Sequence, residues 1–377
     1  KISGREQIKF SQFFINKKQI SLSNNQQFSS NIKEQKFLRK IKDIFFGDSI
    51  PQSFFFSKEL RLFIEDFKPT IIYTILGSNF FMSMVDHIQQ EYQLPLAIHF
   101  MDDWQSCIYK KGIFSLLERK KMKYLLKKII KNSDICMAIS DEMKIEYTKR
   151  YEKEFLSFQN CIDIENLEVN NYLGTKNNKD PFTLTYTGSI LPFAQFYSLI
   201  DITKAIKELR NEGYNIIFKI YTPLSISSKY TKKLKLIDYS IEINDSITDD
   251  EKFFKVLNKS SGLFLPVNFD NFTKKFIRYS MPTKVPSYLI SNTPIIAYGP
   301  KDVAQIKYAT KAKWAYVVST RSIRELKKTI LRLKDDTTQN TKIVKKANIA
   351  FYQFHNAKNV RKEFQKVLRD SVRNNKS

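Results

Sequence analysis

The alternation of short apolar segments with amphipathic segments constrains this chain most strongly. Segments of helical periodicity such as Lys58–Phe67, Ser115–Lys131 and Phe196–Glu212 separate runs that read as buried strands. These runs are Thr70–Leu76, Leu96–Phe100, Ser133–Ser140, Phe182–Thr187, Asn215–Tyr221, Ile241–Ile243, Gly262–Pro266 and Pro294–Tyr298. Strands that alternate with helices at this spacing form βαβ units around a parallel sheet. The sequence therefore predicts an α/β fold with two doubly wound, Rossmann-like domains.

A polar run closed by proline, from Gly174 to Pro181, is typical of a linker between domains. We expect an N-terminal domain over residues 1–174, a C-terminal domain over 175–355, and a C-terminal segment over 356–377. The helix Asn356–Leu368 in that segment is expected to pack back on the first domain. No apolar run approaches the roughly 20 residues that span a bilayer, and the first residues show no signal-peptide core. Because the chain begins at Lys1 rather than Met, the sequence leaves open whether the native N-terminus is missing.

The formal net charge of +25 predicts attraction to a polyanion, such as nucleic acid, an anionic membrane leaflet or a phosphorylated substrate. An AT-rich coding sequence would also enrich lysine and would leave the charge without a function. No zinc finger, RNP-like strand or helix-turn-helix signature supports nucleic acid as a partner. The three cysteines are widely spaced and lack metal-ligand companions, which favours a reducing cytoplasm, with the inner membrane surface as a further location.

Two segments of the second half have the chemistry of a phosphate site. Gly188-Ser189 follows a strand, where a glycine lets backbone N–H groups approach a phosphate. The segment SMPTKVPSYLISNTPIIAYGP, from Ser280 to Pro300, reads as a helix that begins near Thr283-Lys284 and stops at Asn292. A hydroxyl and a lysine at a helix start would cradle a pyrophosphate. Taken alone, these residues also fit a simple turn and a capped helix with a solvated lysine.

The same segment resembles the donor-site motif of GT-B glycosyltransferases, and especially that of the large family 4 of retaining enzymes. Further stretches fall in family order, namely LTYTGSI, NIIFKIYT and WAYVV in the second half and IHFMDDW in the first. The resemblance implies the GT-B fold, in which two Rossmann-like domains face each other across a cleft. It also implies a nucleotide-sugar donor and no cofactor.

Carried over by position, the resemblance assigns eight residues to donor binding: Gly188, Ser189, Tyr221, Thr222, Ser246, Arg278, Lys284 and Ser287. Thr283, at the predicted helix start, is the ninth predicted donor-binding residue. Gly188 and Ser189 would face the diphosphate, and Lys284 with Arg278 would neutralise it in place of a metal. Tyr221, Thr222 and Ser246 would surround the base, with Ser287 near the ribose. The sequence departs from the family pattern where two glutamates are usual, because Tyr279 and Ser287 occupy those positions.

A second cluster, His99, Asp102 and Asp103, follows a strand of the first half and is the predicted catalytic group. Adjacent carboxylates raise each other's pKa, which suits a general base. The competing interpretation of the two aspartates is a helix N-cap pair. No Asp-x-Asp triplet lies at a strand end, so we expect no metal site.

Together these features predict a metal-independent glycosyltransferase that moves a sugar from a nucleotide-sugar to a hydroxyl of a glycan or lipid-linked acceptor. Surface polysaccharide or glycoconjugate synthesis is the expected setting. Two alternatives stay open: a sugar-nucleotide 2-epimerase of the same fold, and a non-enzymatic basic protein that binds polyanions. The basic clusters Arg119-Lys120-Lys121 and Lys127-Lys128 are expected to hold the enzyme against anionic lipid.

Overall fold

The computed structural model describes residues 49, 51, 53–165 and 181–374. Most of the predicted linker lies outside these residues, so the expected division at residue 174 stays a prediction. Contacts between Cα atoms divide the described residues into two compact units, one with those up to 97 and 108–134, the other with 98–107 and those from 135 onward. Among the described residues, no helix is long and apolar enough to cross a membrane.

The smaller unit consists mainly of helices beside one short strand: α3 (Lys58–Phe67), β1 (Ile72–Thr74), α4 (Asn79–Tyr92) and α5 (Ser115–Asn132). The side chains of Ser57 and Ser78 accept hydrogen bonds from the first turns of α3 and α4, so both helices begin at a capped residue. Ser115, although a residue type that often caps helices, does not cap α5. Phe114 occupies the cap position, and Ser115 is the first helical residue.

A four-stranded sheet has the order β1-β2-β3-β4, and the division between the units passes through β2. Its elements after β1 are β2 (Leu96–Phe100), the 3-10 helix η1 (Trp104–Ser106), β3 (Ile135–Ala138), α6 (Asp141–Tyr151) and β4 (Leu156–Ser157). Every residue of β2 and β3 is buried. Ser140 caps α6 by accepting a hydrogen bond from the Met143 amide at 3.1 Å. The sheet thus places residues 99–106 and the start of α6 at the carboxyl ends of β2 and β3.

The second sheet has six parallel strands in the order β10-β9-β8-β5-β6-β7. They are β5 (Phe182–Thr187), β6 (Ile216–Tyr221), β7 (Glu242–Asn244), β8 (Gly262–Pro266), β9 (Ile295–Tyr298) and β10 (Tyr316–Val318). Read from β7, this is the 3-2-1-4-5-6 order of a Rossmann sheet, whose ligands bind where the order reverses. The switch point lies between β5 and β8, so the residues after β5, Gly188 and Ser189, stand at the expected ligand position.

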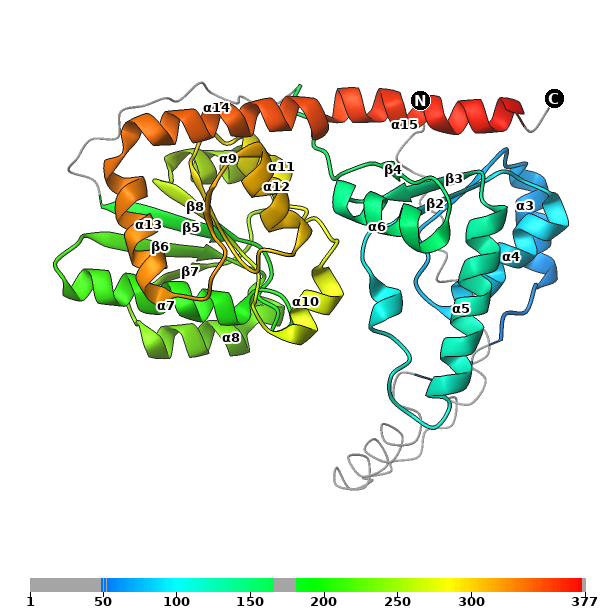
Figure 1. Ribbon diagram of the computed structural model, residues 1–377, viewed down its shortest axis with the longest axis horizontal. Helices are drawn as coiled ribbons and strands as arrows, with labels where there is room; N and C mark the ends of the chain where they lie inside the picture. Colours follow the sequence, from blue (N-terminus) through cyan, green and yellow to red (C-terminus); the bar gives the residue numbers. More distant parts are fainter. Residues whose placement is uncertain (1–48, 50, 52, 166–180, 375–377) are drawn as a thin grey trace, which may run out of the picture. The chain divides into compact units, whose positions relative to one another are not determined.

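Helices cover both faces of the six-stranded sheet, with α7 and α8 on one side and α9, α11 and α12 on the other (Figure 1). The helices are α7 (Phe196–Asn211), α8 (Leu224–Ile237), α9 (Asp250–Lys259), α10 (Asn271–Ile277), α11 (Val285–Ile290), α12 (Ala304–Ala312), α13 (Ile323–Asp335) and α14 (Thr337–Phe354). Leu184, Phe218 and Phe264 of the strands form the core with residues of α7 and α13. Asn292, predicted to end the helix in a left-handed conformation, has a φ of 55°.

The last helix, α15 (Ala357–Asn374), is longer than the predicted Asn356–Leu368. It contacts β3 within the larger unit. The ring of Phe364 packs edge-on against Phe158, with 5.4 Å between ring centroids. A parallel bridge between Ile162 and Asn356 precedes the helix. These contacts lie within one unit and leave the proposed domain limits as a prediction.

Candidate functional site

The turn after β5 requires glycine at position 188. Gly188 has a φ of +119°, a conformation that side-chain-bearing residues rarely adopt. A Cβ atom at this position would lie 2.8 Å from Nζ of Lys284. The Gly188 amide donates to the carbonyl of Tyr221 at 2.8 Å, so it is already used within the sheet. Within the described part of the chain, no acceptor receives the amide of Ser189. Glycine therefore makes room for the lysine, and Ser189 offers the available donor.

Lys284 is a cation without a carboxylate partner among the residues that the structure describes. Its side chain is partly buried, and Nζ lies 4.0 Å from the centroid of the Tyr186 ring. Burial lowers the pKa of Lys284 from 10.5 to about 7. A buried cation that only an aromatic face stabilises gains strongly from an anionic ligand. Its location beside Gly188 therefore makes Lys284 a candidate contact for an anionic ligand.

Two buried tyrosines that the sequence interpretation missed build this corner. The Tyr186 hydroxyl donates to the Ser189 carbonyl at 2.6 Å, while its ring supports Lys284. The hydroxyl of Tyr288 in α11 accepts a hydrogen bond from the Thr187 amide at 2.9 Å. Strand alternation could have indicated Tyr186, because residues two apart in a strand point to the same face. Together the tyrosines connect α11 to the turn after β5.

The positions expected around the base follow β6 and β7 at the same edge of the sheet. Tyr221 ends β6 and pairs with Thr187 and Asn244. Thr222 is fully buried, and its hydroxyl donates to the Ser227 hydroxyl at 2.7 Å, so this side chain is engaged within the protein. Ser246 is exposed, and its amide donates to the Asp245 carboxylate at 2.7 Å.

The remaining donor positions precede or belong to α11. The predicted helix start at Thr283 is two residues too early, because Lys284 is the cap and Val285 begins a helix of only six residues. Thr283 is exposed and Ser287 is partly buried. Arg278 is also exposed, with its guanidinium 5.5 Å from the centroid of the Tyr279 ring. No described contact joins Arg278 to Lys284.

Hydrogen bonds from other parts of the larger unit hold the segment just before Lys284. Ser140 donates to the Tyr279 carbonyl at 2.6 Å, and Asn160 donates to the Met281 carbonyl at 3.0 Å. The Ser280 hydroxyl donates to the carboxylate of Asp102 at 2.5 Å. Asp102 is partly exposed, at the end of β2. The predicted catalytic cluster is thereby bonded to the segment that leads into the donor motif.

Asp103 forms the centre of a buried polar network. Its carboxylate accepts hydrogen bonds from Ser106 at 2.6 Å, from Tyr147 at 2.7 Å and from Gln105 at 3.0 Å. It also forms an ion pair with Arg150 at 2.9 Å. Burial acts to raise the pKa of Asp103, but the hydrogen bonds and the arginine charge outweigh it and leave the pKa below its usual value. The expectation of a raised carboxylate pKa is therefore wrong for Asp103, since opposite charge and donors dominate over the neighbouring carboxylate.

His99 is buried within β2, with 5% of its surface exposed. Burial lowers its pKa to about 4, although the backbone of Phe158 and Ala138 opposes this effect. The imidazole is consequently neutral near pH 7. The structure thus brings His99, Asp102 and Asp103 together at one strand end but gives them different surroundings. His99 lies inside the sheet, Asp102 is partly exposed, and Asp103 is buried and accepts several hydrogen bonds.

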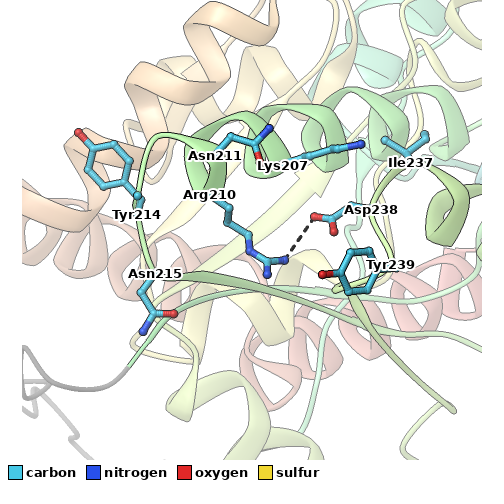
Figure 2. A pocket seen from close by; sticks show the side chains of 9 residues that line it. Lys207, Arg210, Asn211, Tyr214, Asn215, Ile237, Asp238 and Tyr239 are labelled. Atoms are coloured by element: carbon cyan, nitrogen blue, oxygen red, sulfur yellow. Dashed lines mark ion pairs between the residues drawn. The ribbon is translucent and has the colours of Figure 1, made fainter.

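A cavity of about 330 Å³ lies away from all of these residues, before the first residues of β6 and β7. Figure 2 shows Arg210 directed toward Asp238 across it, and their charged groups lie 3.5 Å apart. The lining residues are Lys207, Arg210, Asn211, Gly213, Tyr214, Asn215, Ile237, Asp238 and Tyr239. None of the predicted site residues lines this cavity. In the described part of the chain, no group of three His, Cys, Asp or Glu side chains has the arrangement of a metal site.

Comparison with known proteins gives structural rather than sequence similarity. No protein-family model matches the sequence, and no curated protein sequence matches it. TarM superimposes with a TM-score of 0.57 at 12% identity, covering 81% of this chain and 57% of TarM. The chain thus spans less than two thirds of TarM. Sucrose-phosphate synthase from Thermosynechococcus elongatus gives a TM-score of 0.59 at 10% identity, covering 82% of this chain and 75% of that protein.

A third similar structure is HepE of Anabaena, solved in complex with UDP and glucose. Its TM-score is 0.57 at 12% identity, with coverage of 82% of this chain and 80% of HepE. These similarities concern the fold, because the identities are low. The chain therefore has the α/β GT-B fold of these structures.

Proposed function

We propose that this protein is a glycosyltransferase that moves a sugar from a nucleotide-sugar donor to a hydroxyl of a glycan or lipid-linked acceptor. Surface polysaccharide or glycoconjugate synthesis at the cytoplasmic face of a membrane is the proposed setting. The observation that carries the proposal is Lys284, a partly buried ammonium that lacks a carboxylate partner among the described residues and lies beside Gly188 at the switch point of the Rossmann sheet. HepE, which has a similar fold, was solved with UDP and glucose.

A diphosphate is the ligand that best fits the turn after β5, where Lys284 and the Ser189 amide lie. Its negative charge would supply the counter-ion that Lys284 lacks, and the Ser189 amide would donate a hydrogen bond to a phosphate oxygen. Gly188 leaves space for the ammonium group, since any side chain would occupy the position beside Nζ. Tyr221, the last residue of β6, and Ser246, just after β7, are proposed to contact the nucleoside. The sequence motif alone supports three further proposed donor contacts, Arg278, Thr283 and Ser287.

In the proposed reaction the bond between the sugar C1 and the diphosphate oxygen breaks, and a bond between C1 and the acceptor oxygen forms. The nucleoside diphosphate leaves with the electron pair, and the acceptor hydroxyl gives its proton to the carboxylate of Asp102, the proposed base. Lys284 would stabilise the charge that develops on the leaving oxygen. We propose that this ammonium group serves where other transferases use a divalent metal, so that the reaction needs no metal ion or cofactor.

On the acceptor side, Asp102 is the proposed group that touches the substrate. Its carboxylate is partly exposed and has only the Ser280 hydroxyl as a described hydrogen-bond partner. Asp103 and His99 are proposed to position the loop after β2, because Asp103 is saturated by donors and His99 is buried.

A panel of UDP-, GDP- and dTDP-sugars in a thermal-shift assay tests the proposal, because a ligand that binds only the folded state raises its melting temperature. We expect one nucleotide class to raise it in the wild type but not in Lys284→Met. Lys346→Met serves as the matched control, since Lys346 is an exposed lysine of α14. If no sugar nucleotide shifts the wild type, or if Lys284→Met responds normally, the donor assignment fails.

Product analysis separates this function from its alternatives. An isomerised sugar nucleotide without any acceptor would identify a 2-epimerase. Salt-dependent binding to duplex DNA, without affinity for sugar nucleotides, would identify a basic polyanion-binding protein. Free nucleoside diphosphate that appears only with a glycan or lipid-linked acceptor is the result expected for a transferase.

A further inference from the structure

We propose that the outward face of α5 docks on the surface of an anionic lipid bilayer. This face consists of Leu116, Leu117, Lys120, Lys123, Tyr124 and Lys127. The proposal goes beyond the donor chemistry and is independent of it, although a lipid-linked acceptor would give the docking a purpose. All of these residues belong to the smaller unit of the structure.

The helix α5 has two clearly different faces. Its inner face is buried and includes Met122, Leu126 and Ile129, and α5 packs against α4 (Figure 1). Residues spaced three, four and seven apart lie on one face of a helix. Leu116, Lys120, Lys123 and Lys127 follow this spacing on the opposite face. The inner face already supplies the packing that a helix of a globular domain needs.

The outward face carries apolar side chains that a merely solvated face would not need. Leu116 is 76% exposed, Leu117 is 60% exposed and Tyr124 is 67% exposed. Ile113, just before the helix, is exposed as well. Single exposed apolar residues are ordinary on protein surfaces, but a group on one helix face indicates an interaction surface. The first turn of the outward face is thus aliphatic, with an aromatic ring two turns later.

Three lysines share this face and are fully available. Lys120, Lys123 and Lys127 are exposed, and none forms an ion pair with a described residue. The fold separates them from other cations of the same helix. Lys128 is directed inward, where it pairs with Asp86 at 2.7 Å. The basic run Lys127-Lys128 seen in the sequence is therefore divided between two faces, and only one of the two lysines can meet a membrane.

An anionic bilayer matches this combination better than other partners do. Aliphatic side chains enter the acyl boundary, while lysine ammonium groups reach phosphate headgroups on long flexible stems. Tyrosine suits the interface between apolar and polar layers. A nucleic acid would use the cations but leave the leucines in water. The net charge of +25 adds long-range attraction to any anionic surface, which the lysines of this face would orient.

The experiment uses the full chain and two kinds of vesicle. One contains phosphatidylcholine alone, and in the other about one lipid in three is phosphatidylglycerol, which gives a negative surface potential. We expect co-sedimentation with the anionic vesicles only, and it should weaken as salt is raised. Lysine-to-glutamine changes at positions 120, 123 and 127 should reduce binding roughly 100-fold, since each lysine near such a surface contributes about fivefold. The changes Leu116→Gln and Leu117→Gln should reduce it at least ~10-fold at every salt concentration.

The matched control replaces Lys342, Lys345 and Lys346 of α14 with glutamine. All three are exposed, and the change in net charge is the same. Equal losses in the α5 and α14 triple variants would overturn the proposal, because they would assign binding to overall charge. Absence of binding by the wild type, or equal binding to neutral vesicles, would overturn it too. Loss of a dimer in Leu116→Gln/Leu117→Gln, without vesicle binding by the wild type, would identify a second copy of the chain as the partner.

A spectroscopic measurement reports insertion directly. The two native tryptophans, Trp104 and Trp314, are buried, so a Tyr124→Trp variant adds one water-exposed indole. Its emission should shift to shorter wavelength on anionic vesicles. An unchanged emission while the protein is bound would refute insertion of this face. Thermal-shift responses to sugar nucleotides are measured on the same variants. They report on the donor site alone and therefore distinguish its failure from a failure of membrane docking.

Discussion

Replacing Lys284 with methionine should have opposite effects on stability and on donor affinity. Methionine keeps much of the length and apolar character of the lysine stem but removes the charge. In the ligand-free protein the ammonium group lies against Tyr186 and beside Gly188, without a carboxylate partner among the described residues. Removing an unpaired buried charge stabilises a fold, whereas removing a cation from the proposed donor site weakens binding of an anionic ligand.

The pKa of Lys284 sets the size of the expected stability change. Burial lowers it from 10.5 to about 7, and each pKa unit corresponds to about 1.36 kcal/mol. Keeping this group charged in the fold therefore costs at most on the order of 5 kcal/mol at pH 6. Because the side chain keeps some solvent contact, we expect Lys284→Met to raise the free energy of unfolding by about 2 kcal/mol. A charged hydrogen bond to a diphosphate contributes about 1.5–3 kcal/mol, so donor affinity should fall roughly 10- to 150-fold.

The sign of the pH dependence follows from the lowered pKa. Between pH 7 and pH 10 the unfolded chain binds a proton at Lys284 that the fold has released, so this residue makes stability rise with pH. The stability difference between Lys284→Met and wild type should consequently be largest at pH 6 and shrink toward pH 10. Denaturant unfolding of both proteins at these pH values measures it, and calorimetric titration with the sugar nucleotide measures affinity. A variant that is less stable than wild type, or that binds donor equally well, would refute the reasoning.

The other predictions concern donor binding, the turn, the polar network and the metal. Wild-type donor affinity should be highest below about pH 7 and fall up to about tenfold per pH unit above it, because only protonated Lys284 is a cation; an affinity that is flat from pH 6 to 9 contradicts this. Gly188→Ala should lower stability by about 1–3 kcal/mol through backbone strain and abolish the donor-induced thermal shift. Asp103→Ala should lower the free energy of unfolding by about 3–5 kcal/mol at pH 7, because it leaves Arg150 without its buried partner. The difference from wild type in denaturant unfolding should shrink below pH 4, where the carboxylate protonates. Transfer activity should persist in excess EDTA, and loss with rescue by Mn²⁺ would show that a metal takes part.

The sequence by itself determined the features that depend on a few neighbouring residues. The alternation of strands and helices predicted every strand of the six-stranded sheet except β10, usually to within two residues. Asn292 was recognisable as a helix stop, because a left-handed residue at a helix end depends on local sterics. The position of Gly188 after β5 also followed, since parallel strands present their carboxyl ends at one edge.

Only the tertiary structure decided the charge states and partners of the candidate site. Burial acts to raise the pKa of Asp103, but a hydrogen bond from nearby Ser106 and the contacts of Tyr147 and Arg150, both far along the chain, leave this pKa below its usual value. Lys284, just before α11, lies against Tyr186 of β5, a contact that no local sequence pattern predicts. Electrostatic energies depend on distance and burial in space, and these are fixed by which elements pack together. Periodicity and capping, in contrast, depend on neighbours within one or two turns of the same element, which is why the sequence predicts the strands and helices but not the partners of Asp103 and Lys284.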